Sequence, residues 1–144
     1  MRAIILHHIE SMWDSALNKR GTSFEEMSEK VYNYLDCNGY DYVILTRFED
    51  FEREDFCIFN RFVNVVHPYA YGWDEEYHID DPENYCEGGI HSGSVLIEDW
   101  MRELSTHYKE VDICGAFDGE CIEDLEIALD YCKVNFKRIE SLIV

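Results

Sequence analysis

The chain alternates between short apolar runs and stretches in which apolar residues recur every three or four positions. The segments that contain these runs are residues 2–8, 41–46, 110–115 and 137–144. Short runs of this kind, rich in β-branched residues, are typical of strands that are buried on both faces of a parallel sheet. They predict four neighbouring strands of one mainly parallel sheet.

Helices are predicted between these strands. The first follows a capping box at residues 22–26 and ends at residues 38–39, an Asn-Gly pair that tolerates a left-handed backbone. The second covers residues 95–108, although residues 95–97 also fit a strand, and the third covers residues 120–133. Helices that alternate with strands predict crossover connections, and therefore helices on both faces of the sheet.

The predicted fold class is α/β, a three-layer sandwich with a mainly parallel central sheet of the Rossmann-like type. At 144 residues the chain has the commonest size of one domain, and neither an internal repeat nor a linker divides it. We therefore expect a single domain over residues 1–144.

The middle of the chain, at about residues 50–94, does not alternate in this way. It contains both prolines and many aromatic residues, among them Phe59, Tyr71 and Trp73. A long irregular segment inside a compact domain is usually functional or forms an interface. Two interpretations stay open. The rings are buried within the domain, or residues 56–77 form a subunit or partner interface that makes the protein a homo-oligomer.

The segment from Val111 to Leu125 is the strongest candidate for a functional site. It combines a short apolar strand, a turn bracketed by two glycines and a helix that opens at Cys121. In open α/β folds such a junction lies at the carboxyl edge of the sheet, where ligands bind. Backbone N–H groups and the helix dipole favour a thiolate at this position and could hold an oxyanion. The alternative is a buried cysteine that packs at the start of a helix.

The run from Cys114 to Ile122 resembles the Cys-Gly-x-x-x-x-x-Cys-Val signature of the isochorismatase-like cysteine hydrolases, the superfamily that includes nicotinamidases. Residues 3–8 are similar to the first strand of that family, and residues 42–47, with their Thr-Arg ending, are similar to the second. The three segments occur in the family's order and cover roughly half of the chain. The resemblance implies the three-layer fold and a hydrolase nucleophile at Cys121.

The family's catalysis uses an aspartate at the end of the first strand, a lysine in the middle of the chain and the cysteine. Here His7 and His8 end the first strand, and no lysine occurs between Lys30 and Lys109. Only the cysteine transfers, as Cys121, and the acidic residues around it should raise the pKa of its thiol. The predicted catalytic residues are Cys121, His8 and His7, and the predicted substrate-binding residues are Gly115, Phe117, Gly119 and Arg47.

The charge of the chain is strongly acidic. Thirty-one acidic residues face 12 basic ones, which gives a net charge of −19. A charge of this sign argues against nucleic acid as a direct ligand. Two interpretations remain: the acidic surface keeps the protein soluble, or it docks on a basic protein partner.

The apolar runs and the cysteines indicate the compartment of the protein and whether it contacts a membrane. No apolar run approaches the ~20 residues of a membrane helix, and the amino-terminal run is too short and too quickly polar for a signal peptide. The six cysteines are scattered, as expected of reduced thiols. We expect a cytoplasmic protein without membrane contact. Compact relatives of the resembled family occur in bacteria and their phages, so a bacterial or phage-infected cell is the expected setting.

The six histidines do not have the spacing of a dedicated metal site. His7 and His8 should point to opposite faces of a strand, so at most one of them could join a more distant histidine. We predict neither a metal nor another cofactor.

Two classes of function stay open. The first is an acidic protein-binding or regulatory module that keeps the family's fold without its full catalytic triad. The second is a cysteine-dependent hydrolase of a small amide or vinyl-ether ligand, with Cys121 as the nucleophile and His8 or His7 in the place of the base. Because the aspartate and the lysine are missing, the first class is preferred.

Overall fold

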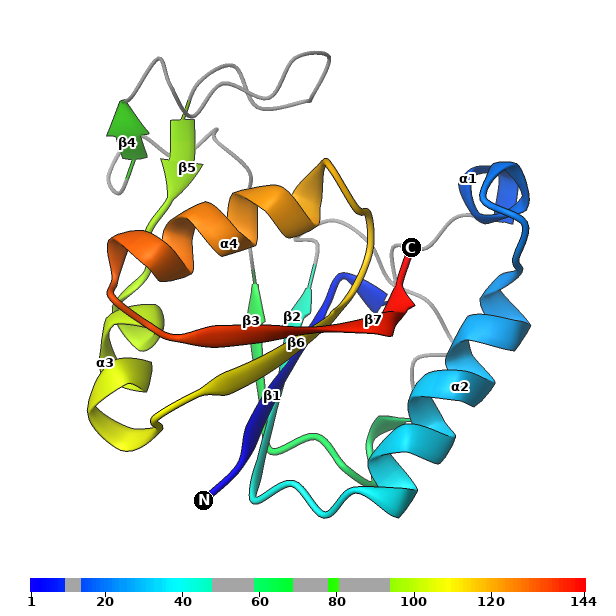
Figure 1. Cartoon of the computed structure of the whole chain (residues 1–144), viewed down its shortest axis with the longest axis horizontal. Helices are drawn as coiled ribbons and strands as arrows, with labels where there is room; N and C mark the ends of the chain where they lie inside the picture. Colours follow the sequence, from blue (N-terminus) through cyan, green and yellow to red (C-terminus); the bar gives the residue numbers. More distant parts are fainter. Residues whose placement is uncertain (10–13, 48–58, 69–77, 81–93) are drawn as a thin grey trace.

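The computed structural model describes residues 1–9, 14–47, 59–68, 78–80 and 94–144. Within them, five parallel strands form one sheet in the order β3-β2-β1-β6-β7, and two short antiparallel strands pair separately (Figure 1). The strands are β1 (Ala3–His7), β2 (Tyr42–Arg47), β3 (Val65–Pro68), β4 (His78–Asp80), β5 (Ser94–Leu96), β6 (Val111–Gly115) and β7 (Phe136–Ile143). The helices are α1 (Asp14–Lys19), α2 (Phe24–Cys37), α3 (Asp99–His107) and α4 (Cys121–Tyr131).

Helices cover both faces of the five-stranded sheet (Figure 1). On one face, Ile5 and Ile113 of the two central strands pack with Leu125 of α4, in an apolar cluster that also takes in residues of α3. On the other face, Ile4 and Leu6 pack with residues of α1 and α2. The central strand therefore contributes side chains to two apolar cores, one on each face of the sheet. This arrangement confirms the α/β class and the parallel sheet between helical layers.

All four predicted strands are present, and they are neighbours in the sheet, as expected. β1 pairs in parallel with both β2 and β6, and β6 pairs in parallel with β7. These pairings require crossover connections, which α2 and α4 supply. The predicted helix at 95–108 is divided: β5 takes up its first residues, and α3 begins only at Asp99.

The middle of the chain was expected to be irregular, and this is wrong for two stretches. Residues 78–80 form β4, which pairs with β5. Residues 65–68 are the longer stretch. They form β3, which extends the sheet beyond β2 with Ile44 opposite Val65. Within the described residues β3 ends the sheet, and its Val66 side chain is 41% exposed. A strand of four residues with one outward-facing side is too short for its alternation to be recognised in the sequence.

The predicted interface at residues 56–77 lies partly outside the described residues, and Tyr71 and Trp73 fall there. Phe59 is described, and its side chain is fully buried in the core between the sheet and α2. For this ring the interpretation as an interface is wrong, because the ring fills the interior of its own domain.

The capping box at the start of α2 is confirmed in part. The Ser23 hydroxyl accepts a hydrogen bond from the Glu26 N–H at 3.2 Å. The expected left-handed end is wrong, because Asn38 has an extended backbone with φ of −114°. Instead, the Asn38 side-chain amide and backbone N–H both donate to the Tyr34 carbonyl.

Among the described residues, no helix is both long and apolar enough to cross a membrane.

Candidate functional site

The carboxyl edge of the sheet brings several of the predicted residues together. His7, the last residue of β1, lies opposite Thr46 of β2 on one side and Gly115 of β6 on the other. The approach of β1 to β6 is close: a Cβ on Gly115 would lie 1.9 Å from the His7 carbonyl oxygen. Only glycine allows this contact, so Gly115 supports the site by its lack of a side chain.

The His7 ring is fully buried at this edge and is held by Thr46. Its Nδ1 lies 2.6 Å from the Thr46 hydroxyl, and this hydroxyl donates to the Leu6 carbonyl at 3.3 Å. Because a threonine hydroxyl has one proton to give, Nδ1 of His7 is the donor in this arrangement. The threonine therefore orients the imidazole.

The alternation of side chains along a strand predicted that His7 and His8 point to opposite faces of the sheet. This prediction is wrong. The strand ends at His7, and His8 has a positive φ of 52°, which turns the chain. The two rings stack with their centroids 3.9 Å apart and an interplanar angle of 17°. Both imidazoles are therefore buried side by side, and the His8 N–H donates to the Thr46 carbonyl at 3.1 Å.

The turn between β6 and α4 has the expected glycines at its two ends. Gly119 has a φ of 74°, and the Asp118 N–H donates to the Val144 carbonyl at 2.6 Å, which ties the turn to the end of the chain. Phe117 is buried and packs into the core on the side of α1 and α2, with the Arg20 guanidinium 4.6 Å from its ring centroid. Arg47 is the last residue of β2, opposite Pro68, and its side chain lies outside what the structure describes.

Cys121 opens α4, as predicted, and its side chain is only 7% exposed. It belongs to the apolar cluster on the α3 and α4 side of the sheet, and is therefore in the opposite core from Phe117. Burial raises the pKa of the Cys121 thiol to about 12, and the nearby Asp124 and Glu120 carboxylates add to this rise. The backbone N–H groups of Phe117 and Cys121 oppose the rise. The expected N–H groups do face the sulfur, but burial outweighs them.

Acidic side chains lie on the turn before α4, on α4 itself and on β7, and we call five of them the acidic rim. Arg138 of β7 makes three ion pairs with them, at 2.6 to 2.9 Å, and Arg20 lies 3.9 Å from a fourth carboxylate. With five carboxylates and two guanidinium groups, the rim has a formal charge of −3. The acidic rim consists of Asp118, Glu120, Glu123, Glu126 and Glu140.

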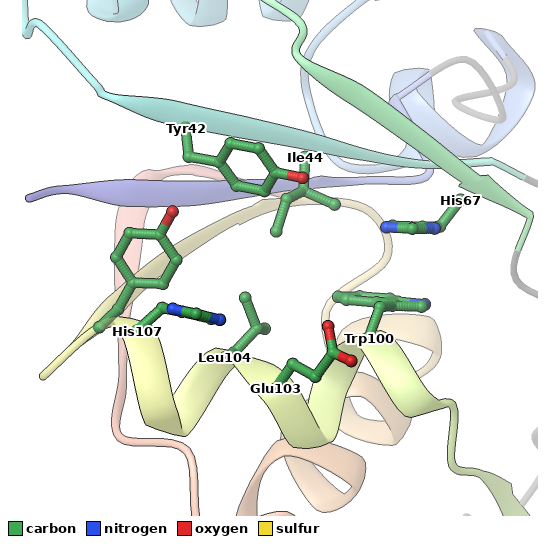
Figure 2. A pocket seen from close by; sticks show the side chains of 8 residues that line it. Tyr42, Ile44, His67, Trp100, Glu103, Leu104 and His107 are labelled. Carbon is green, nitrogen blue, oxygen red and sulfur yellow. The ribbon is translucent and has the colours of Figure 1, made fainter.

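A cavity of about 350 Å³ lies between α3 and the strands β2 and β3 (Figure 2). Two pairs of rings form its walls. His67 stacks on Trp100 with centroids 4.7 Å apart and an interplanar angle of 3°, and Tyr42 stacks on Tyr108 at 6.2 Å. The other residues that line the cavity are Ile44, Glu103, Leu104 and His107.

The cavity was not predicted from the sequence, because the sequence pattern indicated only some of the residues that line it. The face of α3 that contains Trp100, Leu104 and Tyr108 was recognised by its helical spacing. On the sheet, Tyr42 and Ile44 lie on a predicted strand, but His67 was missed because it belongs to β3. Burial lowers the pKa of His67, so its imidazole is neutral at neutral pH.

No group of three or more His, Cys, Asp and Glu side chains in the described part of the chain is placed to hold a metal ion. Comparisons of the chain with protein-family models, with curated proteins and with solved structures found no significant match.

Proposed function

We propose that the protein is a diverged isochorismatase-like module that lacks hydrolase chemistry and acts as an acidic protein-binding or regulatory module. The state of Cys121 carries this proposal. A thiol with a pKa of about 12 is ionised in only about one molecule in 10⁵ at pH 7, and the thiolate is the nucleophilic form. The residue that the resemblance implies as nucleophile is therefore chemically silent.

The surroundings of Cys121 support the same conclusion. A nucleophilic cysteine needs an adjacent base or a nearby cation, and the family's lysine has no counterpart between Lys30 and Lys109. The carboxylates of Asp124 and Glu120 act in the opposite direction, since negative charge disfavours a thiolate. His7 Nδ1 is hydrogen-bonded to the Thr46 hydroxyl, so this nitrogen holds the ring in place.

The acidic rim supports a basic protein as the partner. It lies on the β6 and β7 side of the sheet, beside the turn that follows the carboxyl end of β6, and its net charge is negative even after its two arginines are counted. A surface of this kind accelerates and orients the approach of a positively charged partner.

Alkylation by iodoacetamide, followed by mass spectrometry of each cysteine peptide, tests the loss of hydrolase chemistry. Cys37 is exposed on α2 and serves as the internal control within the same molecule. At pH 7 we expect Cys37 to react at the rate of a free thiol and Cys121 at least ~100-fold more slowly, because its thiolate is scarce. Faster alkylation of Cys121 than of Cys37 would contradict the proposal and restore the hydrolase alternative.

Binding of an unstructured peptide of alternating lysine and glycine residues, measured by calorimetry at low salt, tests the acidic rim. Glu123→Gln combined with Glu140→Gln should weaken binding about 5-fold or more, since each removed charge is worth up to ~1 kcal/mol. The matched control neutralises Glu25 and Glu29, two exposed acids of α2. If both double variants weaken binding equally, only the overall charge attracts the peptide, and the rim is not the partner surface.

A further inference from the structure

We propose that the cavity between α3 and the strands β2 and β3 binds a small uncharged molecule with a hydroxyl group on an apolar body. The inference is independent of the proposed function, because the cavity shares no residue with the acidic rim. Its volume of about 350 Å³ is at the lower end of the range for small-molecule sites, so a compact ligand fits. An apolar floor and several unused hydrogen-bonding groups are the features that would hold such a ligand.

The floor of the cavity is apolar and fixed by the fold. Ile44 of β2 is 1% exposed and Leu104 of α3 is 4% exposed. Figure 2 shows the two side chains pointing towards each other from the sheet and from the helix. An apolar body that covers them gains free energy in proportion to the area that it buries. A charged group in the same place would lose its water without a replacement hydrogen bond.

The stacked rings limit what a ligand can touch. His67 lies face to face with Trp100, with centroids 4.7 Å apart and an interplanar angle of 3°. Tyr42 and Tyr108 are paired at 6.2 Å and 18°. Because the rings of each pair cover one another, the cavity does not surround a ligand with open ring faces. Recognition must therefore come from the polar atoms of these side chains and from the apolar floor.

These polar atoms have unused hydrogen-bonding capacity. In the part of the chain that the structure describes, no hydrogen bond is made by the Tyr42 and Tyr108 hydroxyls or by the His67 and His107 rings. Figure 2 shows Tyr42 and His67 reaching from the sheet into the same space. A tyrosine hydroxyl and a neutral imidazole can each donate and accept a hydrogen bond. A ligand hydroxyl does both as well, and is therefore complementary to them.

The interior of the cavity disfavours charge of either sign. Burial lowers the pKa of His67, so its imidazole is neutral at neutral pH, and burial raises the pKa of Tyr108, so its hydroxyl keeps its proton. Glu103 and His107 also line the cavity, one turn apart on α3. Both are exposed, so water screens the charge that either of them carries. Among the described residues that line the space, none is a buried counter-ion for a charged ligand.

Benzyl alcohol, benzoate and benzylammonium test the class of ligand, because they share one apolar body and differ in charge. Titration at constant ionic strength is followed by the NMR signal of the Trp100 indole N–H, which is identified by its loss in Trp100→Phe. We expect saturable binding of benzyl alcohol at millimolar concentration and at least ~5-fold weaker binding of each ion. The net charge of −19 would favour benzylammonium, so this order cannot arise from the overall charge. Equal or tighter binding of either ion, or no saturation by the alcohol, would overturn the proposal.

Tyr42→Phe and Tyr108→Phe locate the binding, because each removes one hydroxyl and keeps the ring. Either variant should weaken the binding of benzyl alcohol about 3- to 10-fold, the value of one hydrogen bond. Toluene, which has no hydroxyl, should bind both variants within ~2-fold of the parent protein, which also shows that the cavity is intact. The matched control is Tyr32→Phe on the opposite face of the sheet, which should change neither probe by more than ~2-fold. If neither cavity variant weakens benzyl alcohol more than toluene, its hydroxyl is not recognised there and the proposal is wrong.

Discussion

Replacing Gly115 by alanine tests the junction on which the carboxyl edge of the sheet is built. Gly115 ends β6 opposite His7 of the central strand, and its φ of +122° is in the region that favours glycine. An added Cβ would lie 1.9 Å from the His7 carbonyl oxygen, which also accepts the Ala116 N–H at 3.0 Å. Because this neighbour is backbone of the central strand, hydrogen-bonded on both sides, it cannot rotate away.

Three costs add up in Gly115→Ala. A side chain at this φ costs about 1–2 kcal/mol. Real Cβ atoms essentially never approach closer than 3.0 Å, so β1 and β6 must separate by about 1.1 Å (3.0 − 1.9), and overpacking of this kind costs about 1–3 kcal/mol. The hydrogen bond of Ala116 is worth about 0.5–1.5 kcal/mol. We expect the free energy of unfolding to fall by about 2.5–6.5 kcal/mol, a large share of the stability of a domain.

Two other glycines supply matched controls for a urea unfolding series followed by circular dichroism. Gly119 has a positive φ of 74° but no atom within 4 Å of an added Cβ, so Gly119→Ala should cost only about 1–2 kcal/mol. Gly39 has neither constraint, and Gly39→Ala should stay within about 1 kcal/mol of the parent protein. If Gly115→Ala unfolds at the same urea concentration as Gly119→Ala, the close approach of β6 to His7 is wrong. Failure of Gly115→Ala alone to fold is the extreme form of the expected result.

Three further predictions concern stability and assembly. In the folded state, burial raises the pKa of the Cys121 thiol from an ordinary 9.0 to about 12. The free energy of unfolding should therefore have its full value well below pH 9 and should fall as the pH rises towards 12. Cys121→Ala should lose about 2 kcal/mol less than the parent protein between pH 9 and pH 10.5 in urea unfolding. The Tyr40 hydroxyl donates to Asp112 at 2.6 Å in a half-buried setting, so Tyr40→Phe should cost about 1–2 kcal/mol, whereas Tyr32→Phe at an exposed contact should cost less than about 0.5 kcal/mol. Light scattering should show a homo-oligomer that persists as salt rises if residues 56–77 associate through apolar rings, and a monomer at every protein and salt concentration would contradict this.

The sheet could be predicted from the sequence because its central strands are apolar on both faces. Residues 3–6 of β1 and 42–45 of β2 are continuous apolar runs, and parallel strands covered by helices on both sides require such runs. The strand at residues 65–68 could not be predicted in this way, because it ends the described sheet and exposes one side. The helix at 14–19 has only six residues, which is too short for a periodic pattern to stand out.

The position of the candidate thiol could be predicted, but its chemistry could not. The glycine-bracketed turn and the helical spacing after it placed Cys121 at the start of α4. The pKa of the thiol depends on how far the surrounding core excludes water, and that core is assembled from segments distant in the chain, such as those of Ile5 and Met101. Local N–H groups and the helix dipole can be inferred from the sequence, whereas burial of this extent is a property of the tertiary packing.

The silent thiol and the aromatic cavity depend on the same helix. Met101 and Leu104, on the inner side of α3, belong to the apolar cluster that contains Cys121, and Trp100 and Glu103 of the same helix line the cavity. A displacement of α3 that admitted water to the cluster would lower the pKa of the thiol, and it would also separate Trp100 from His67 and open the cavity. The buried, protonated thiol and the stacked rings are therefore consequences of the same packing of α3 against the sheet.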